Sequence, residues 1–562
     1  MNTLLNEPCL INTSQGFCVL YKEKYLYSKY NPSKNIKTIV QNLEILPGTL
    51  ILAFSPLLCY GLEELIQKLP KDSQVLAVEF DENLLSFSKK YIQNLCEKYK
   101  NNFHLLSKND ILNFHKILQK KSPVLEDNFF LLPPGSFKRA ISIDFSAGTQ
   151  FYKNLYDQFL QISQNAISTF YKNRITLTKF SRKYCHNIFK NLVNFPDSVP
   201  ISSLKNTILK PILILGTGSS VLETLYKIQN CTQKFFIISL DATLPILKSF
   251  KIRADLIISE ECQNVIEKMF IGSEKCSPLA ICAFTNAPNT VNFSAKNISY
   301  FISAFTDADF LKNLSKITNF PNFINPFGSV GLTAIYFSLY LRKNENVKIF
   351  FSGLDFSFDK NFTHAKGSTV YKNLFFEQTK LKPLNQFSSI FNQTNVKILS
   401  KNKNELFSTK ALLNYANVFS IFRAEKNLFD IRNDGVFLGT KEGFLEFDQI
   451  LKSDEQEQNQ ILIQQFSNEE KIKIKNEIKI FFENEIKNLT LAKDILTSKI
   501  ELPETERNQT LTKILENREY LYLHFPDGYR FLLEISFLKR VRTELDFYLK
   551  EFKIDLKNLL QN

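Results

Sequence analysis

Short apolar runs alternate with longer amphipathic stretches through the middle of this chain, and this alternation limits the possible folds more than any other feature. The runs lie at residues 211–215, 235–240, 255–259, 279–284, 300–305 and 348–352. Buried strands that alternate with helices form mainly parallel sheets covered by helices on both faces. The sequence therefore predicts an α/β fold with a Rossmann-like, mainly parallel sheet in its central part.

The N-terminal part has a related pattern. Residues 49–54 and 74–80 are strand-like and are separated by a helical stretch at 61–69. The second run ends at Glu79, which resembles the acid that binds ribose in a methyltransferase-type Rossmann unit. The first turn is FSPL at 54–57 and lacks the usual glycines. Because a bulky turn closes the space for a cofactor, we expect a degenerate Rossmann-like domain with a structural role.

The chain of 562 residues is too long for one core. Apolar residues recur every three to five positions from about 154 to 195, which indicates a helix, and the chain beyond about 450 is polar and helical. We predict a degenerate Rossmann-like N-terminal domain, a helical linker, a central catalytic domain and an α-helical C-terminal domain, at residues 1–150, 151–200, 201–445 and 446–562.

Composition narrows the partners and the compartment. The net charge of +14 favours anionic ligands such as sugar nucleotides or ATP, but the lysines are scattered, so we predict no nucleic-acid partner. The nine cysteines have no metal-site spacing, which indicates reduced thiols. The chain shows neither a signal-peptide pattern nor an apolar run of about 18 residues, so we expect a cytoplasmic protein without a membrane span.

The segment PILILGTGSSVLE at 211–223 runs from a strand through a glycine turn into a helix. Gly216 and Gly218 permit a ligand to approach the main chain, and the helix start offers N–H groups to an anion. Ser220 and Glu223 also fit a capping box, which stabilises a helix start without any ligand. The segment alone leaves both readings open.

Polar side chains follow most of the predicted strands. In parallel sheets, ligands bind beyond the carboxyl ends of the strands. We therefore predict a binding crevice at this edge, formed by residues 216–220, Asp241, Glu260, Glu261, Thr285, Asn286 and Asp355.

Two further features lie near the same predicted edge. The turn NPFGSVG at 325–331 contains Gly328 and Ser329 and precedes an apolar helix, so it either meets the same ligand or permits close helix packing. His364 is in a loop nine residues after Asp355. Its imidazole suits a general base, although a loop histidine is also common on a solvated surface.

Several motifs together resemble one family in their order and spacing. They are GTGSS at 216–220, SLDATLPIL at 239–247, IRADLIIS at 252–259, GSV at 328–330, SGLDFSF at 352–358 and THAKG at 363–367. This is the family of bacterial motility accessory factors, which act in flagellin glycosylation and share their central domain with archaeal MptE-like 6-hydroxymethylpterin diphosphokinases. The resemblance covers about residues 175–440. The order of a Rossmann-like N-terminal part, a central domain and a helical C-terminal part is also similar to that of the family.

The resemblance implies a sialyltransferase-like transferase. It would move a nonulosonic acid, such as pseudaminic or legionaminic acid, from a CMP donor to Ser or Thr of flagellin. The nucleotide would be held by Gly216, Thr217, Gly218, Ser219, Ser220 and Asp241, with Gly328 and Ser329 near the donor. His364 and Asp355 would lie near the reacting groups, with His364 as the general base.

The chain departs from the family pattern in three places. Ser219 replaces a proline, Phe327 replaces the first glycine of the second turn, and Glu260 aligns with an aspartate. An added Phe side chain is expected to narrow the pocket or alter the ligand.

Two other functions stay open. One is pyrophosphoryl transfer from ATP to a pterin-like alcohol, with Mg²⁺ held by acids such as Asp241, Glu260 or Asp355. The other is a non-catalytic flagellin-binding assembly factor.

Overall fold

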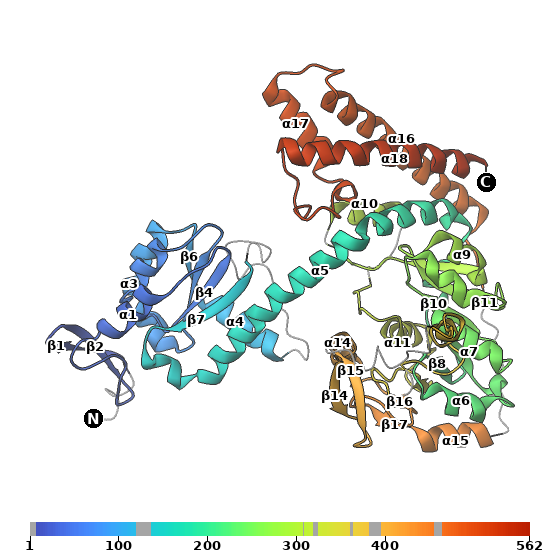
Figure 1. The fold of residues 1–562 in the computed structure, drawn as a ribbon, viewed down its shortest axis with the longest axis horizontal. Coiled ribbons are helices and arrows are strands. Elements are labelled where there is room, and N and C mark those ends of the chain that lie inside the picture. The colour runs from blue at the N-terminus through green and yellow to red at the C-terminus, as the bar shows by residue number, and fades with distance from the viewer. Residues whose placement is uncertain are drawn as a thin grey trace. The chain divides into compact units, whose positions relative to one another are not determined.

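A computed structural model of the chain describes residues 7–119, 137–306, 308–318, 324–359, 363–381, 395–453 and 463–561. The chain separates into two compact units, Met1–Thr176 and Leu177–Asn562 (Figure 1). The long helix α5 (Lys153–Asn194) begins in the first unit and ends in the second. It covers the stretch that the apolar spacing predicts to be helical.

The first unit contains a parallel sheet with strand order β6-β5-β4-β7. Its strands are β4 (Thr49–Phe54), β5 (Gln74–Val78), β6 (Phe103–Leu105) and β7 (Arg139–Asp144). One face packs against α1 (Lys34–Asn42), α2 (Leu62–Gln67) and α3 (Glu82–Lys98), and the other against α4 (Lys108–Gln119) and α5. A small antiparallel sheet joins β1 (Cys9–Thr13), β2 (Gly16–Tyr21) and β3 (Lys24–Tyr25).

The second unit contains an eight-stranded sheet with the order β12-β11-β10-β9-β8-β13-β16-β17, and all of its pairs are parallel. The strands are β8 (Ile212–Leu215), β9 (Phe236–Leu240), β10 (Leu256–Ser259), β11 (Ser277–Ala283), β12 (Ala295–Phe301), β13 (Ile349–Ser352), β16 (Leu428–Asp430) and β17 (Lys441–Glu442). The predicted α/β class with mainly parallel sheets is confirmed. The strand predicted at 300–305 is displaced, because β12 covers Ala295–Phe301 and its first half carries polar residues that weaken the apolar signal.

Side chains alternate between the two faces of this sheet. On one face, Ile214, Ile238 and Ile258 pack with α11 (Val330–Leu341) and α14 (Lys410–Val418). On the other face, Leu213, Leu215 and their neighbours pack with helices that precede, connect or follow the strands along the chain. These are α6 (Val221–Ile228), α7 (Leu244–Ser249), α8 (Glu267–Phe270), α9 (Pro288–Ser294), α15 (Phe444–Lys452) and the end of α5.

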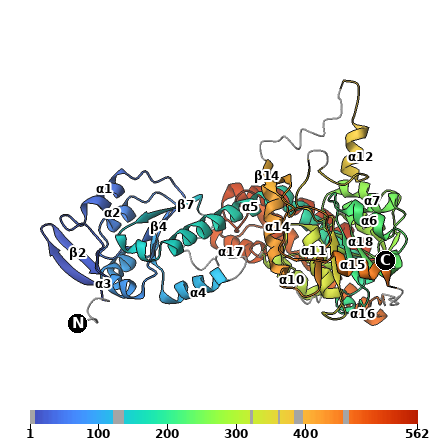
Figure 2. The same cartoon turned by 90° about the horizontal axis from the view of Figure 1, so that it is seen from below.

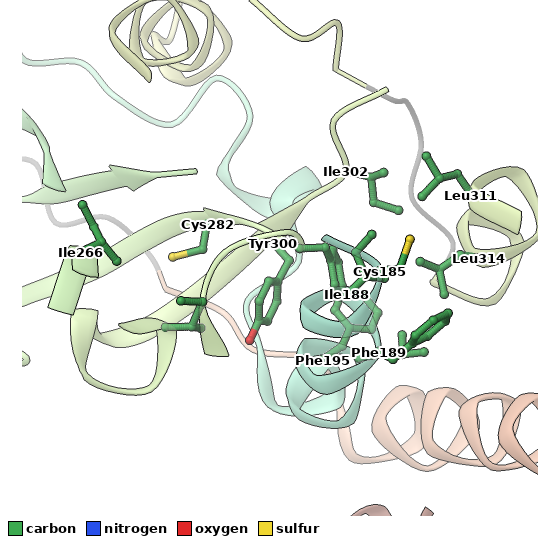
Figure 3. Close-up of a cluster of buried hydrophobic side chains, with 14 of the residues drawn as sticks. Cys185, Ile188, Phe189, Phe195, Ile266, Cys282, Tyr300, Ile302, Leu311 and Leu314 are labelled. Carbon is green, nitrogen blue, oxygen red and sulfur yellow. The ribbon is translucent and has the colours of Figure 1, made fainter. Parts of the chain in front are cut away.

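The end of α5 is part of the core of the second unit. Figure 3 shows Cys185, Ile188 and Phe189 on this helix, near Leu311 and Leu314 of α10 (Asp309–Thr318). The C-terminal helices α16 (Asn468–Leu496), α17 (Glu504–Leu515) and α18 (Ile535–Gln561) contribute to the same hydrophobic cluster. The helical C-terminal region therefore shares a core with the parallel sheet.

Two peripheral elements complete the second unit. A hairpin joins β14 (Asn395–Leu399) to β15 (Glu405–Thr409), and α12 (Thr369–Phe376) stands clear of the sheet (Figure 2). Among the residues that the structure describes, no helix combines the length and apolar character that a membrane crossing requires.

Candidate functional site

The topology of the second unit indicates where the predicted ligand crevice would lie. The chain enters the sheet at β8, adds β9 to β12 on one side, and then adds β13 on the other side of β8. The order of the strands therefore reverses between β8 and β13. In open parallel sheets this reversal marks the binding crevice, at the carboxyl ends of the strands. The glycine turn at 216–220 follows β8, and residues 353–355 follow β13.

The two turns at this point interlock through their main chains. Gly216 N donates to Ser352 O at 2.8 Å, and Gly218 N donates to Gly353 O at 2.8 Å. A Cβ on Gly216 would lie 2.4 Å from Gly353 O, and Gly353 itself has a φ of +74°. The close approach of the two turns therefore requires glycines here. This requirement holds whether or not a ligand binds.

Ser220 and Asp355 join the same two turns. Ser220 N donates to Asp355 Oδ2 at 3.0 Å, and Ser220 Oγ donates to Asp355 Oδ1. Gly353 N donates to Ser220 Oγ at 2.8 Å. The capping-box reading is therefore wrong, because Ser220 Oγ makes no cap to its own helix and Glu223 pairs with Lys227 instead. The carboxylate of Asp355 fixes the start of α6.

Burial raises the pKa of Asp355, while the positive charge of Arg432 and the hydrogen bonds from Ser220 oppose that rise. Arg432 is fully buried. Its Nε and one terminal nitrogen donate to the two oxygens of Asp430 at 2.9 and 2.6 Å, and the other donates to Leu354 O at 2.8 Å. Sequence reasoning missed this residue, because the polar segment RNDG at 432–435 gives no sign that its arginine is buried.

Acidic side chains lie at the ends of the neighbouring strands. Asp241 accepts hydrogen bonds from Ala242 N at 2.6 Å and from Ser259 Oγ at 2.7 Å. Asn286 Nδ2 donates to the same Ser259 oxygen at 2.9 Å. Two predicted crevice residues, Asp241 and Asn286, thus meet through Ser259. The serine itself was not predicted to take part, because it is the last residue of a buried strand.

Glu260 accepts a hydrogen bond from Thr333 Oγ1 of α11 at 3.0 Å. Burial raises the pKa of Glu260 to about 7, and the charge of Asp241 adds to this rise. Burial likewise raises the pKa of Asp241 to about 6. Both acids are therefore less ready to ionise than exposed ones. Within the described residues, no three His, Cys, Asp or Glu side chains gather around a metal position.

The second glycine turn lies at the start of α11. Gly328 has a φ of +76°, and a Cβ there would approach the Tyr415 ring to 2.7 Å. Ser329 is half-buried and forms no side-chain cap. The Phe327 ring is buried and lies 5.7 Å from Tyr336 and 5.6 Å from Phe422, centroid to centroid. The ring packs in the core, so the expectation that it narrows a pocket has no support in its contacts.

The loop that contains His364 attaches to the first glycine turn. Ala365 N donates to Thr217 O at 2.8 Å, and His364 Nδ1 lies 3.2 Å from Thr363 Oγ1. Burial lowers the pKa of His364, so the neutral imidazole is favoured. Three predicted site segments are therefore brought together, namely residues 216–220, Asp355 and the His364 loop. Thr243 Oγ1 donates to Leu215 O at 3.1 Å and ties the Asp241 segment to β8.

At the corresponding strand ends of the first unit, the acid is enclosed by the unit's own side chains. Glu79 is fully buried and accepts from Ser55 Oγ at 2.6 Å, Tyr156 OH at 2.9 Å and Asp81 N at 3.0 Å. Ser55 in turn accepts from Ser146 Oγ at 3.0 Å. Burial raises the pKa of Glu79 to about 7. The acid that a Rossmann unit offers to ribose is here bonded to protein groups.

Comparisons with known proteins agree with this architecture. Residues 186–361 match the family model described as 6-hydroxymethylpterin diphosphokinase MptE-like. The fold of the chain is similar to the solved structure of the MAf glycosyltransferase from Magnetospirillum magneticum AMB-1. That likeness has a TM-score of 0.54 and 12% identity, and it covers 99% of this chain and 93% of the other. The predicted resemblance is thus confirmed for the MptE-like domain and for the Maf fold.

The chain is also 30% identical to an uncharacterized protein of Treponema pallidum (strain Nichols), over 97% of this chain and 94% of that protein. It therefore belongs to the family of that protein, with an MptE-like domain at its centre.

Proposed function

We propose that this chain is a glycosyltransferase that moves a nonulosonic, sialic-acid-like sugar from a CMP donor to Ser or Thr of flagellin, and so supports flagellar assembly and motility. The observation that carries the proposal is the fold shared with a Maf glycosyltransferase along 99% of the chain. Within that fold, the MptE-like match includes both interlocked turns of the crevice. We assign the reaction to the cytoplasm, where the nine free cysteines would stay reduced.

In this proposal the donor lies across the edge formed by residues 216–220, Asp241, Gly328 and Ser329. The helices α6 and α11 both start at this edge, and the positive ends of their dipoles favour the donor phosphate. The raised pKa values of Asp241 and Glu260 reduce the negative charge that the phosphate meets. Asp355 acts as a positioning residue, because its carboxylate is bonded to Ser220.

The transfer needs a base for the acceptor hydroxyl. The hydroxyl oxygen bonds to the anomeric carbon while the bond from that carbon to the CMP phosphate oxygen breaks, and CMP leaves with the electron pair. His364 takes the hydroxyl proton. Its lowered pKa keeps it neutral near pH 7, and a proton on Nδ1 directed at Thr363 Oγ1 would leave Nε2 as the acceptor.

Intact-mass analysis of flagellin tests this function. Flagellin produced with the wild-type protein and a CMP-nonulosonate supply should gain the mass of one or more sugar residues. The His364→Ala variant should lose most of that gain, because removal of a general base costs roughly 10²- to 10⁴-fold in rate. The proposal fails if flagellin has the same mass with and without the protein. If the His364→Ala variant still transfers the sugar, His364 is not the general base, but the proposed transferase function stands.

The MptE-like match favours a second candidate, the transfer of pyrophosphate from ATP to a pterin-like alcohol. Asp241 and Glu260 would then hold Mg²⁺ at the crevice. Thermal unfolding separates the candidates, because a ligand that binds the native state raises the melting temperature. A rise with CMP or CMP-sugars supports the transferase, a rise with ATP and Mg²⁺ supports the kinase, and neither rise supports a non-catalytic flagellin-binding factor.

A further inference from the structure

A cavity of about 630 Å³ opens among the C-terminal helices of the second unit, away from the crevice. Its walls come from α10, from α16 and from the segment at 517–520, and Phe189 of α5 also lines it. None of the crevice residues named above is among those that line it. Pockets for small ligands commonly have about 300–1,000 Å³, so this cavity has the size of a specific binding site.

Aromatic rings form one wall of the cavity. The Phe189 ring lies 6.0 Å from Phe481 and 5.2 Å from Tyr520, and the Phe310 ring lies 5.8 Å from Tyr520, centroid to centroid. All four residues line the cavity. Figure 3 shows Phe189 extending from α5 on the side of the C-terminal helices. Phe189, Phe310 and Tyr520 are buried, so the half-buried ring of Phe481 provides the aromatic surface of this wall, and the neighbouring rings hold it in place.

Amide side chains surround this aromatic wall. Asn484 and Asn488 are one helical turn apart on α16, and Asn517 and Asn313 come from the other two segments. Asn313 Oδ1 accepts from Lys316 Nζ at 3.3 Å. In the described part of the chain, the side chains of Asn484, Asn488 and Asn517 have no hydrogen-bond partner. Each amide can both donate and accept a hydrogen bond to a ligand.

The charges at the cavity are balanced. Arg518 Nε and one terminal nitrogen donate to the two oxygens of Glu485 at 2.9 and 2.8 Å, and Tyr520 OH also donates to Glu485. The remaining pair of charged residues, Lys316 and Glu477, have opposite signs. No net field therefore selects an anion or a cation here, unlike at a nucleotide site.

We propose that this cavity binds a neutral carbohydrate of about two or three sugar units. Sugar rings have C–H faces that pack on aromatic rings and hydroxyl groups that both donate and accept, which matches this lining. A helical peptide would instead need a long apolar groove that takes side chains at helical spacing. The inference rests on the cavity alone and does not depend on the proposed transferase activity.

Isothermal titration of the full chain with neutral trisaccharides tests the proposal. The probes are maltotriose, cellotriose, mannotriose and chitotriose, with 3′-sialyllactose as a charged probe. We expect at least one neutral sugar to bind the wild-type protein. The double variant Asn484→Ala/Asn488→Ala should bind that sugar at least about tenfold more weakly, because each lost hydrogen bond weakens binding several-fold.

The matched control is Asn476→Ala, which removes the same side chain from the same helix outside the cavity. It should bind as the wild type does. Circular dichroism should show native helix content for both variants, since Asn476 and Asn484 are exposed and Asn488 is half-buried. The proposal is overturned if no neutral trisaccharide binds, if sialyllactose is preferred, or if the double variant binds as tightly as the control.

Discussion

The two parallel sheets of this chain differ in how many protein donors surround the acids that follow their strands. In the first unit, Glu79 after β5 is fully buried and accepts from three protein donors. In the second unit, Asp241 after β9 accepts from two donors, and Glu260 after β10 accepts from one side-chain hydroxyl. The strand ends of the first unit, the closed crevice, thus have an acid with three protein donors, whereas the acids at the predicted crevice of the second unit keep more of their acceptor positions.

The difference teaches that an acid after a strand is not by itself a ligand site. The number of protein donors around the acid decides whether it can also bind a ligand, because a carboxylate has about four acceptor positions. A buried carboxylate whose hydrogen bonds join two turns has a structural role.

The first prediction concerns the buried guanidinium of Arg432, which donates to the main chain of the turn after β13. Arg432→Ala should lower the free energy of unfolding by about 3–5 kcal/mol, because it removes the side-chain donors of the buried Asp430 carboxylate and, among the described residues, leaves only Lys401 Nζ, 3.6 Å away, as a charged partner. Urea unfolding followed by circular dichroism measures this loss. Lys426→Ala is the control, because it removes a lysine from an exposed ion pair with Glu345, and it should change stability little. Equal effects of the two variants would contradict the role of Arg432.

The second prediction concerns the interlocked turns. Gly353→Ala should cost about 3 kcal/mol, because the new Cβ would lie 2.4 Å from Gly216 O and the residue has a φ of +74°. Gly367→Ala is the matched control. It has a φ of +90°, but its nearest neighbour lies at 3.7 Å, so only the backbone penalty of about 1 kcal/mol remains. If urea unfolding gives the same loss for both, the turns are not closely packed.

The third prediction concerns the closed crevice. Glu79 has a folded-state pKa raised to about 7, so the folded unit holds a proton that the unfolded chain releases near pH 4.5. Its contribution to stability is present below about pH 4.5 and is lost as the pH rises through about 7. The loss is about 3 kcal/mol. Hydrogen exchange of peptides from the first unit should show this decline in the wild type, and Glu79→Gln should flatten it. An unchanged decline in Glu79→Gln would show that other groups cause it.

The fourth prediction compares the two crevices through a ligand. The affinity for CMP-N-acetylneuraminic acid should fall a few-fold to about tenfold from pH 5.5 to pH 8, because Asp241 and Glu260 ionise near a phosphate. Asp241→Asn should flatten the profile, and Glu79→Gln should leave it unchanged. Titration calorimetry at several pH values measures this dependence. If Glu79→Gln changes the pH dependence of the affinity instead, the ligand binds in the first unit, which contradicts the prediction.

The sequence predicts most strands of the central sheet and the polar residues that follow them at its edge, because buried runs and the residues after them are local features. It does not predict how that edge is connected. Ser220 and Asp355 are 135 positions apart, so their hydrogen bond is visible only in the folded chain, and it replaces the capping box that the local pattern suggests. Ser259 and Thr333 were missed for the same reason, since their partners come from other segments, and the bond from Arg432 to Leu354 O likewise joins distant segments.

Hydrogen exchange with bound donor tests the central contrast most directly. With saturating CMP-N-acetylneuraminic acid, peptides that contain residues 216–220 and 363–368 should exchange more slowly, and those that contain residues 55–59 should not change. Protection at 55–59 without protection at 216–220 would contradict the account, because the donor would then bind in the crevice that Glu79 closes.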